Sequence, residues 1–205
     1  MRVGARLGIM GGTFDPIHLG HLVAAEEALV QFNLDRVLFM PTGQPAFKAD
    51  ETVTPAEDRY LMTVLATASN PDFDVSRIEV DRPGLTYTVD TLHSLRALFG
   101  PGTELFFITG ADAVWEIVSW KDAEQVADLA TFIAATRPGY DLDAARRAHE
   151  DAETRFRIEY IEVPALAISS TQLRERIQSR RPVRYLMAES VIAYIDKRGL
   201  YRESV

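Results

Sequence analysis

A short run near the start of the sequence, GGTFDPIHLGH, combines residue types that can bind an anion. It follows an apolar segment typical of a strand and precedes a segment with the spacing of a helix. Gly11 and Gly12 let backbone N–H groups approach a ligand closely. His18 and His21 are three positions apart, so they share one face of the first helical turn. Because the N-terminus of a helix also favours negative charge, the run predicts an anion site.

Three other interpretations of this run stay open. The histidines could be a metal pair, but two ligands are too few and no cysteine or His/carboxylate cluster completes a site, so we predict no protein-held metal. They could also be ordinary surface residues at a helix start, and the glycines could simply shape a tight turn. Gly20, between the histidines, removes a side chain that could block a phosphate chain. The spacing matches neither the Walker A loop nor the GxGxxG dinucleotide fingerprint.

A second polar cluster, AISSTQLRERI, follows an apolar, strand-like end late in the chain. Ser169, Ser170 and Thr171 offer hydroxyl groups at the start of a helix, where free N–H groups bind anions. Arg174 lies three residues after Thr171 and four after Ser170, so its guanidinium shares their helix face. The cluster predicts a second phosphate site. Its alternative interpretation is a Ser/Thr N-cap with an arginine that faces solvent.

Two kinds of segment must position these residues. Short β-rich runs predict strands at residues 6–10, 36–40, 73–80, 104–109, 131–136 and 156–163. Segments with helical spacing separate most of them, which implies βα units and a mostly parallel sheet covered on both faces. We therefore predict an α/β fold, a Rossmann-like doubly wound parallel sheet, in one domain over residues 1–205. In such a sheet, ligands bind beyond the C-terminal ends of the strands, where GGTFDPIHLGH lies.

The expected helices show apolar stripes and end signals. The stripes are formed by Leu22, Ala25, Leu29 and Phe32 and by Val89, Leu92, Leu95 and Leu98. Thr54, Pro55 and Glu57 have the pattern of a capping box with Pro at the first helical position. The polar run 139–155 is expected to form a surface helix or loop. The part from about 169 to 205 is expected to be helical, with helices in STQLRERIQ and AESVIAYIDKRG.

Composition limits the class of protein. The chain has 205 residues, 47% of them hydrophobic and 25% charged, which suits a compact fold with a buried core. The absence of cysteine excludes disulfides and cysteine-based zinc sites. The net charge of -8 disfavours a broad nucleic-acid surface, and no apolar run approaches the ~20 residues that span a bilayer. We expect a cytoplasmic protein that binds neither nucleic acid nor membranes; a homo-oligomer is compatible with the sequence.

Together, GGTFDPIHLGH and ISSTQLR resemble the signature motifs of the nucleotidyltransferase superfamily with a histidine-x-glycine-histidine motif. More narrowly, the chain resembles the bacterial nicotinate-nucleotide adenylyltransferases over almost its whole length. The blocks PTGQPAFK, RYLMTVLA, GLTYTVDTL, FFITGAD, SWKD and ATRPGY follow that family's order. The resemblance implies transfer of the AMP part of ATP to nicotinate mononucleotide in NAD biosynthesis, with release of pyrophosphate.

The resemblance also implies roles at ATP. His18 and His21 would contact the phosphates and stabilise charge that develops during transfer. The hydroxyl groups and the arginine of ISSTQLR would hold the β and γ phosphates. The residues implied to bind ATP are Gly11, Gly12, Thr13, Phe14, His18, His21, Gly110, Asp112, Ser170, Thr171 and Arg174. The residues implied to be catalytic are His18, His21, Arg174 and Lys48.

On the side of nicotinate mononucleotide, the resemblance implies four residues. Thr86 and Tyr87 would lie against the nicotinate group, and Trp120 would stack on the pyridine ring. Lys121 would offer its backbone N–H to the carboxylate, with its side chain pointing outward. Trp115 is a competing aromatic residue, for which a place in the core is the preferred interpretation.

One loop departs from the family pattern. The family usually has His immediately before the lysine of this loop, whereas Ala46 and Phe47 precede Lys48 here. The contact between this loop and phosphate is therefore an open question.

The implied chemistry is direct, in-line adenylyl transfer without a covalent enzyme intermediate. A phosphate monoester dianion is already nucleophilic, so catalysis would depend on alignment and on neutralising charge. Mg2+ would bridge ATP oxygens and need few protein ligands. The alternatives are a pantetheine-phosphate adenylyltransferase, a cytidylyltransferase or a non-catalytic nucleotide sensor. Trp120 with GLTYTVDTL favours nicotinate, and the intact His18, His21 and Arg174 argue against a sensor.

Overall fold

A computed structural model of the chain describes residues 5–46, 53–111, 117–136, 147, 155–164 and 166–202. All strand pairs within these ranges are parallel. A six-stranded sheet contains β1 (Arg6–Gly12), β2 (Arg36–Pro41), β4 (Phe73–Val75), β6 (Glu104–Gly110), β7 (Thr131–Thr136) and β8 (Arg157–Glu162). A two-stranded sheet pairs β3 (Gln44–Pro45) with β5 (Leu85–Thr86).

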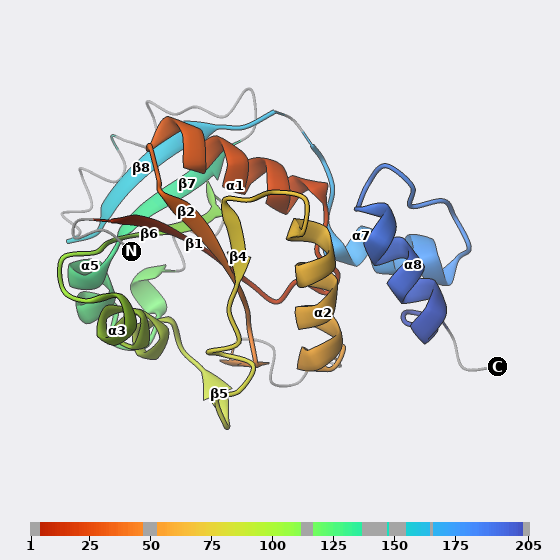
Figure 1. The fold of residues 1–205 in the computed structure, drawn as a ribbon, viewed down its shortest axis with the longest axis horizontal. Helices are drawn as coiled ribbons and strands as arrows, with labels where there is room; N and C mark the ends of the chain where they lie inside the picture. Colours follow the sequence, from red (N-terminus) through yellow and green to blue (C-terminus); the bar gives the residue numbers. More distant parts are fainter. Residues whose placement is uncertain are drawn as a thin grey trace.

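The strand order of the larger sheet is β4-β2-β1-β6-β7-β8. The chain first runs outward from β1 to β2 and β4, and then returns to the other side of β1 with β6, as the path in Figure 1 shows. The order therefore reverses beside β1, which is the place where open α/β sheets bind ligands. The predicted fold class, a Rossmann-like doubly wound sheet, is confirmed.

Helices cover both faces of the sheet (Figure 1). One core packs alternate residues of β1 and β2 against α3 (Thr88–Phe99) and α5 (Ala123–Leu129). The other packs the intervening residues, among them Met10, Val37 and Phe39, against α1 (Leu19–Gln31) and α2 (Ala56–Thr67). Both faces are buried, which explains why these strands are almost continuously apolar.

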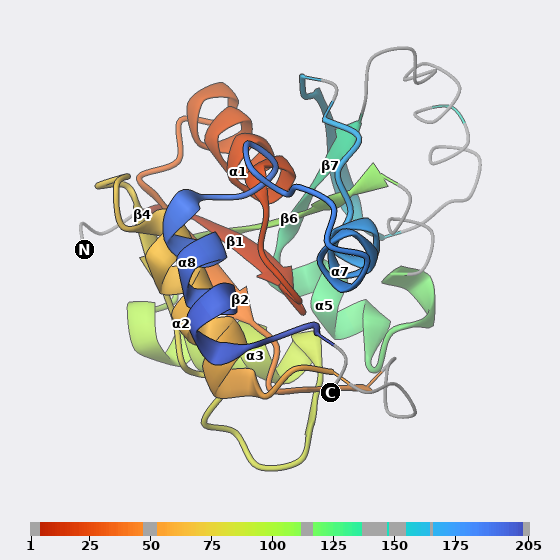
Figure 2. The same cartoon turned by 90° about the vertical axis from the view of Figure 1, so that its right-hand side faces the viewer.

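Two further helices join the second core. They are α7 (Ser170–Gln178) and α8 (Glu189–Arg198), and Leu173, Val191 and Ile195 on them are almost fully buried. Figure 2 views the molecule from the side of these helices and shows α8 lying across α2. The helical part predicted from the sequence thus joins the second core, with α8 against α2, and its helices match the predicted segments.

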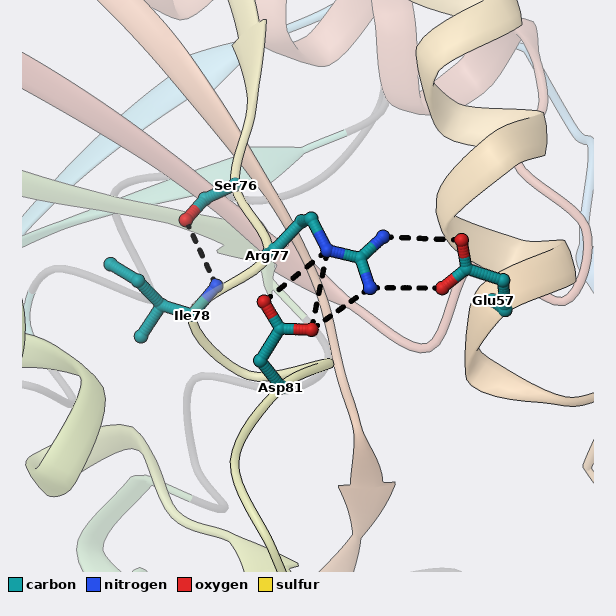
Figure 3. A network of polar contacts seen from close by, with 5 residues as sticks. All are labelled: Glu57, Ser76, Arg77, Ile78 and Asp81. Carbon is teal, nitrogen blue, oxygen red and sulfur yellow. Dashed lines mark hydrogen bonds and ion pairs between the residues drawn. The ribbon is translucent and has the colours of Figure 1, made fainter.

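The prediction of a strand over residues 73–80 is wrong after Val75. Oγ of Ser76 accepts a hydrogen bond from the N–H of Ile78, and the N–H of Asp81 donates to the carbonyl of Arg77. These local bonds turn the chain, because they compete with a strand ladder. The guanidinium of Arg77 lies between Asp81 and Glu57 of α2, so the turn is held against that helix (Figure 3).

The predicted capping box at the start of α2 is also absent. Pro55 is the residue before the helix, and no side chain caps the first turn. The backbone of Thr54 instead joins a buried network, in which its N–H donates to Asp15 and its carbonyl accepts from Arg59. Leu98, at the end of one predicted stripe, is 64% exposed.

Some expectations lie outside the described residues. Almost all of the predicted surface segment 139–155 lies outside the described residues. Within the described ranges, no helix combines the length and the apolar character that a membrane crossing requires.

Candidate active site

The first helix begins at the two histidines. The N–H of His18 donates to Nδ1 of His21 at 3.2 Å, and the two imidazole rings stack with centroids 3.7 Å apart. The ring of Phe14 meets His21 edge-on at 5.0 Å. Because Nδ1 of His21 accepts a hydrogen bond, its neutral ring carries the proton on Nε2. The structure therefore brings both predicted histidines together and leaves Nε2 of His21 as a donor.

Burial keeps both rings neutral. It lowers the pKa of His18 to about 4. It also lowers the pKa of His21 well below its usual 6.5, and the neighbouring His18 adds to this effect. At neutral pH the pair therefore presents polar donors and no positive charge.

The glycines of the first motif make space for rings. A Cβ on Gly11 would lie 2.7 Å from Cζ of Phe107, and a Cβ on Gly12 would lie 2.9 Å from Cε1 of Phe14. A Cβ on Gly20 would lie 3.0 Å from Nδ1 of His18. The sequence predicted that these positions leave space for a ligand. The structure adds that side chains there would collide with the aromatic rings that shape the site.

The second motif docks onto the first. Oγ of Ser169 caps α7 by accepting from the N–H of Gln172, whereas Oγ of Ser170 donates to the carbonyl of Pro16 at 2.9 Å. Nη1 of Arg174 donates to the backbone carbonyl of Asp15 at 2.8 Å, and its Nη2 lies 3.4 Å from Oγ1 of Thr171. The start of α7 therefore lies against the loop that leads to the histidines. The two predicted anion sites form one region.

A cavity of about 210 Å³ opens at the C-terminal ends of β1 and β6. It contains all four residues predicted to bind nicotinate mononucleotide, together with the glycines and threonine of the first motif. Its lining is Gly11, Gly12, Thr13, Thr42, Pro45, Ala46, Glu79, Thr86, Tyr87, Thr88, Phe107, Thr109, Trp120 and Lys121. The histidines and α7 do not line the cavity; the loop after β1 connects them to it.

Aromatic and polar side chains line this cavity together. Trp120 packs edge-on against Phe107, with centroids 5.7 Å apart. The ammonium of Lys121 lies 4.6 Å from the ring centre of Tyr87 and 3.7 Å from Oδ2 of Asp90. Its side chain is 47% exposed, in agreement with the predicted outward direction. Oγ1 of Thr86 is buried and has no hydrogen-bond partner within the described residues. An unpaired hydroxyl in a cavity wall is suited to a polar ligand.

Sequence reasoning missed Arg59, which joins three loops of the site. Arg59 is 1% exposed, and its guanidinium donates to the carbonyls of Thr13, Gly43 and Thr54 at 2.7 to 2.8 Å. Its position was a usable signal, because Arg59 is in phase with the buried Met62 on α2. A charged residue in the apolar stripe of a helix needs buried partners.

Sequence reasoning also missed Glu79, which the prediction placed in a strand. Glu79 is 6% exposed, lines the cavity and accepts a hydrogen bond from Oγ1 of Thr91 at 2.7 Å. A Cβ on Gly43 would lie 2.2 Å from the carbonyl oxygen of Glu79, so the two loops touch through their backbones. Burial raises the pKa of Glu79 to about 7.

This shift predicts a pH-dependent stability. The pKa of Glu79 is 4.5 in the unfolded chain and about 7 in the folded chain. Between these pH values the folded chain binds more protons than the unfolded chain, so the free energy of unfolding falls as the pH rises towards about 7. Glu79→Gln should remove that fall. The free energy of unfolding of the variant, relative to that of wild type, should therefore rise by about 2–3 kcal/mol between pH 5 and pH 8. Urea unfolding at both pH values measures the difference. The histidines affect both proteins alike, and Glu57→Gln, at an exposed carboxylate, is the control. Parallel pH curves for wild type and Glu79→Gln would contradict the assignment.

The remaining predicted residues are placed as follows. Gly110 ends β6 and is exposed. Lys48 and Asp112, and also Phe47 and Trp115, lie outside the described residues. Among the residues that the structure does describe, no group of three or more His, Cys, Asp or Glu side chains could hold a metal ion.

Comparison with known proteins gives close relatives. A probable nicotinate-nucleotide adenylyltransferase of Acidothermus cellulolyticus is 56% identical over 204 residues, which cover 98% of this chain and 96% of the relative. Another of Corynebacterium kroppenstedtii is 58% identical over 199 residues, which cover 97% and 92%.

The fold has a solved counterpart. The nicotinic acid mononucleotide adenylyltransferase of Plasmodium falciparum, complexed with APC, aligns with a TM-score of 0.77 at 20% identity and covers 96% of this chain and 97% of its own. A family model described as cytidylyltransferase-like matches residues 9–176. The chain therefore belongs to the cytidylyltransferase-like family and, within it, to the nicotinate-nucleotide adenylyltransferases.

Proposed function

We propose that the chain joins nicotinate mononucleotide to the AMP part of ATP, forming nicotinate adenine dinucleotide and pyrophosphate. The observation that carries the proposal is the single region in which the cavity walled by Trp120 adjoins the histidine pair and the start of α7. The cavity has the aromatic platform that a pyridine ring needs, and the adjoining helix starts have the donors that a phosphate chain needs.

In the reaction, a phosphate oxygen of nicotinate mononucleotide attacks the α phosphorus of ATP. The bond from that phosphorus to the oxygen of the β phosphate breaks in line, and pyrophosphate leaves with the electron pair. The attacking phosphate carries no proton that must be removed, so the site needs no general base. The protein then contributes alignment of the two substrates and stabilisation of charge on the oxygens.

The histidines contribute as neutral donors in this proposal. Nε2–H of His21 is directed by the bond that its Nδ1 accepts, and burial keeps the ring from taking up a proton. A fixed neutral donor in a site shielded from water stabilises developing negative charge at little reorganisation cost. Thr13 and Phe14 would add backbone groups beside it.

The start of α7 would hold the leaving group. Arg174 uses one arm of its guanidinium on the carbonyl of Asp15, which fixes its plane beside the hydroxyl of Thr171. The hydroxyls, the helix N-terminus and the guanidinium together suit the β and γ phosphates. The described residues include no cluster that could hold a divalent cation, so Mg2+ would be bound mainly through the phosphates of ATP.

Selection of the acid would depend on backbone donors. The ammonium of Lys121 is already engaged by Asp90 and the ring of Tyr87, so we assign the carboxylate to the backbone N–H groups of Lys121 and Tyr87 and to the unpaired hydroxyl of Thr86. A buried carboxylate without donors would cost several kcal/mol.

The test is a pyrophosphate-release assay with ATP and a panel of acceptors. The panel contains nicotinate mononucleotide, nicotinamide mononucleotide, phosphopantetheine and, with CTP in place of ATP, glycerol 3-phosphate. We expect the highest kcat/KM with nicotinate mononucleotide. Higher kcat/KM with phosphopantetheine or with CTP would assign the chain to another activity of the family, and no turnover with any acceptor would favour a nucleotide sensor.

Trp120→Ala should raise KM for nicotinate mononucleotide about ten- to hundredfold, because stacking of a ring on an aromatic side chain contributes roughly 1–3 kcal/mol. KM for ATP should change little. Steady-state kinetics with each substrate varied in turn measures both constants. Trp120→Phe, which keeps an aromatic platform against Phe107, should restore most of the affinity. Equal rises of both KM values would show that Trp120 supports the whole site.

A further inference from the structure

Asp15 lies in the loop between β1 and α1, residues 13–18, which we call the histidine loop. It is buried and forms hydrogen bonds with segments that are distant in the sequence. Its side chain is almost inaccessible, with the residue 6% exposed. Oδ1 accepts a hydrogen bond from the hydroxyl of Tyr201 at 2.6 Å, and Oδ2 accepts one from the N–H of Thr54 at 3.3 Å. Its backbone carbonyl accepts Nη1 of Arg174 at 2.8 Å. One residue therefore connects the guanidinium of Arg174 with the segment that follows α8. We call the start of α7 and the histidine loop, where this guanidinium lies, the phosphate region.

The segment after α8 is held so that Tyr201 reaches inward. Gly199 ends the helix in the left-handed region, and the N–H of Leu200 donates to the carbonyl of Ile195. Tyr201 itself has a φ of +62°, which is unfavourable for a residue with a Cβ and persists where the surroundings fix it. Burial and the charge of Asp15 raise the pKa of Tyr201, so its hydroxyl remains a donor.

We propose that Tyr201 is a positioning residue for the adenylyl transfer, acting through Asp15. This inference rests on the proposed function. The hydroxyl fixes the carboxylate of Asp15, and thereby the peptide carbonyl that holds Arg174 and the turn that leads to His18. Catalysis by alignment is sensitive to small displacements of this kind.

The chain contains a matched pair that separates positioning from stability. The hydroxyl of Tyr194, on α8, donates to Oδ1 of Asp58 at 2.7 Å, and the residue Asp58 is 5% exposed. Both tyrosines are half-buried, and both donate to a buried carboxylate. The Asp58 carboxylate also accepts a hydrogen bond from Arg198, and it belongs to α2 instead of the histidine loop.

The experiment compares Tyr201→Phe with Tyr194→Phe. Tyr201→Phe should lower kcat about ten- to hundredfold and raise KM for pyrophosphate in the reverse reaction, with KM for nicotinate mononucleotide unchanged. Tyr194→Phe should keep wild-type kinetics. Thermal unfolding of both variants establishes that each is folded at the assay temperature. Wild-type turnover, measured first, tests the proposed function separately.

Three outcomes overturn the proposal. They are unchanged kinetics in Tyr201→Phe, an equal loss in both variants, and a loss in Tyr201→Phe that is confined to KM for nicotinate mononucleotide. A double-mutant cycle adds an independent criterion: because Tyr201 acts through Asp15, Asp15→Asn combined with Tyr201→Phe should be no worse than the worse single variant. Additive losses would contradict it. If Tyr201→Phe does not fold, Asp15→Asn alone must show the same rise of KM for pyrophosphate, and its absence overturns the proposal.

Discussion

Replacing His21 with alanine should lower kcat by about a hundredfold or more, while KM for ATP changes only slightly. The expectation follows from the role of Nε2–H as a preorganised donor, because removing one such donor from an active site typically costs about two to three powers of ten in kcat. Interactions that strengthen only in the transition state affect kcat, whereas uniform binding affects KM. Initial rates of pyrophosphate release over a range of ATP concentrations separate the two.

His18→Ala should behave similarly, because the loss of its ring also removes the surface on which His21 stacks. His93→Ala is the control, since His93 is exposed on α3 and contacts Gln125. Near-normal kcat in both His18→Ala and His21→Ala would make these histidines ordinary residues at a helix start. A large rise of KM for ATP at constant kcat would limit them to ground-state binding.

Arg59→Met should lower the free energy of unfolding by about 3 kcal/mol or more. The substitution leaves the carbonyls of Thr13, Gly43 and Thr54 without their donor, and an unpaired buried polar group costs roughly 1–3 kcal/mol. Methionine nearly preserves the volume and adds no charge. Urea unfolding followed by circular dichroism gives the difference from wild type.

Arg77→Met is the matched control for Arg59→Met. Arg77 forms ion pairs with Glu57 and Asp81, but its side chain is 40% exposed, and ion pairs in contact with solvent contribute little to stability (Figure 3). Arg59→Met should therefore be clearly the less stable variant. Equal losses for the two variants would show that the buried hydrogen bonds of Arg59 contribute no more than a surface ion pair.

Local patterns predicted the elements well where neighbouring residues determine the structure. The helix predicted from STQLRERIQ has the observed bounds of α7, because Ser169 caps it locally and Leu173 provides its buried face. The parallel sheet followed from alternation of apolar runs with helical spacing. The histidine motif was located at the correct βα turn for the same reason.

Errors arose where distant residues determine the structure. Thr54 has the sequence pattern of a cap, but its backbone is used by Asp15 and Arg59. Residues 76–80 have the composition of a strand, but the ion pairs of Arg77 hold them as a turn. Arg59 and Glu79 escaped notice because their partners lie in loops that only the fold brings together.

The contacts that complete the phosphate region join residues far apart along the chain. Ser170 and Pro16 are separated by 154 positions, Arg174 and Asp15 by 159, and Tyr201 and Asp15 by 186. Such contacts require the closure of very long loops, which is unfavourable until the sheet and its packed helices already exist. During synthesis on the ribosome, the histidine loop emerges long before its partners. Nucleotide binding should therefore be acquired late, as one of the last properties of the folding chain.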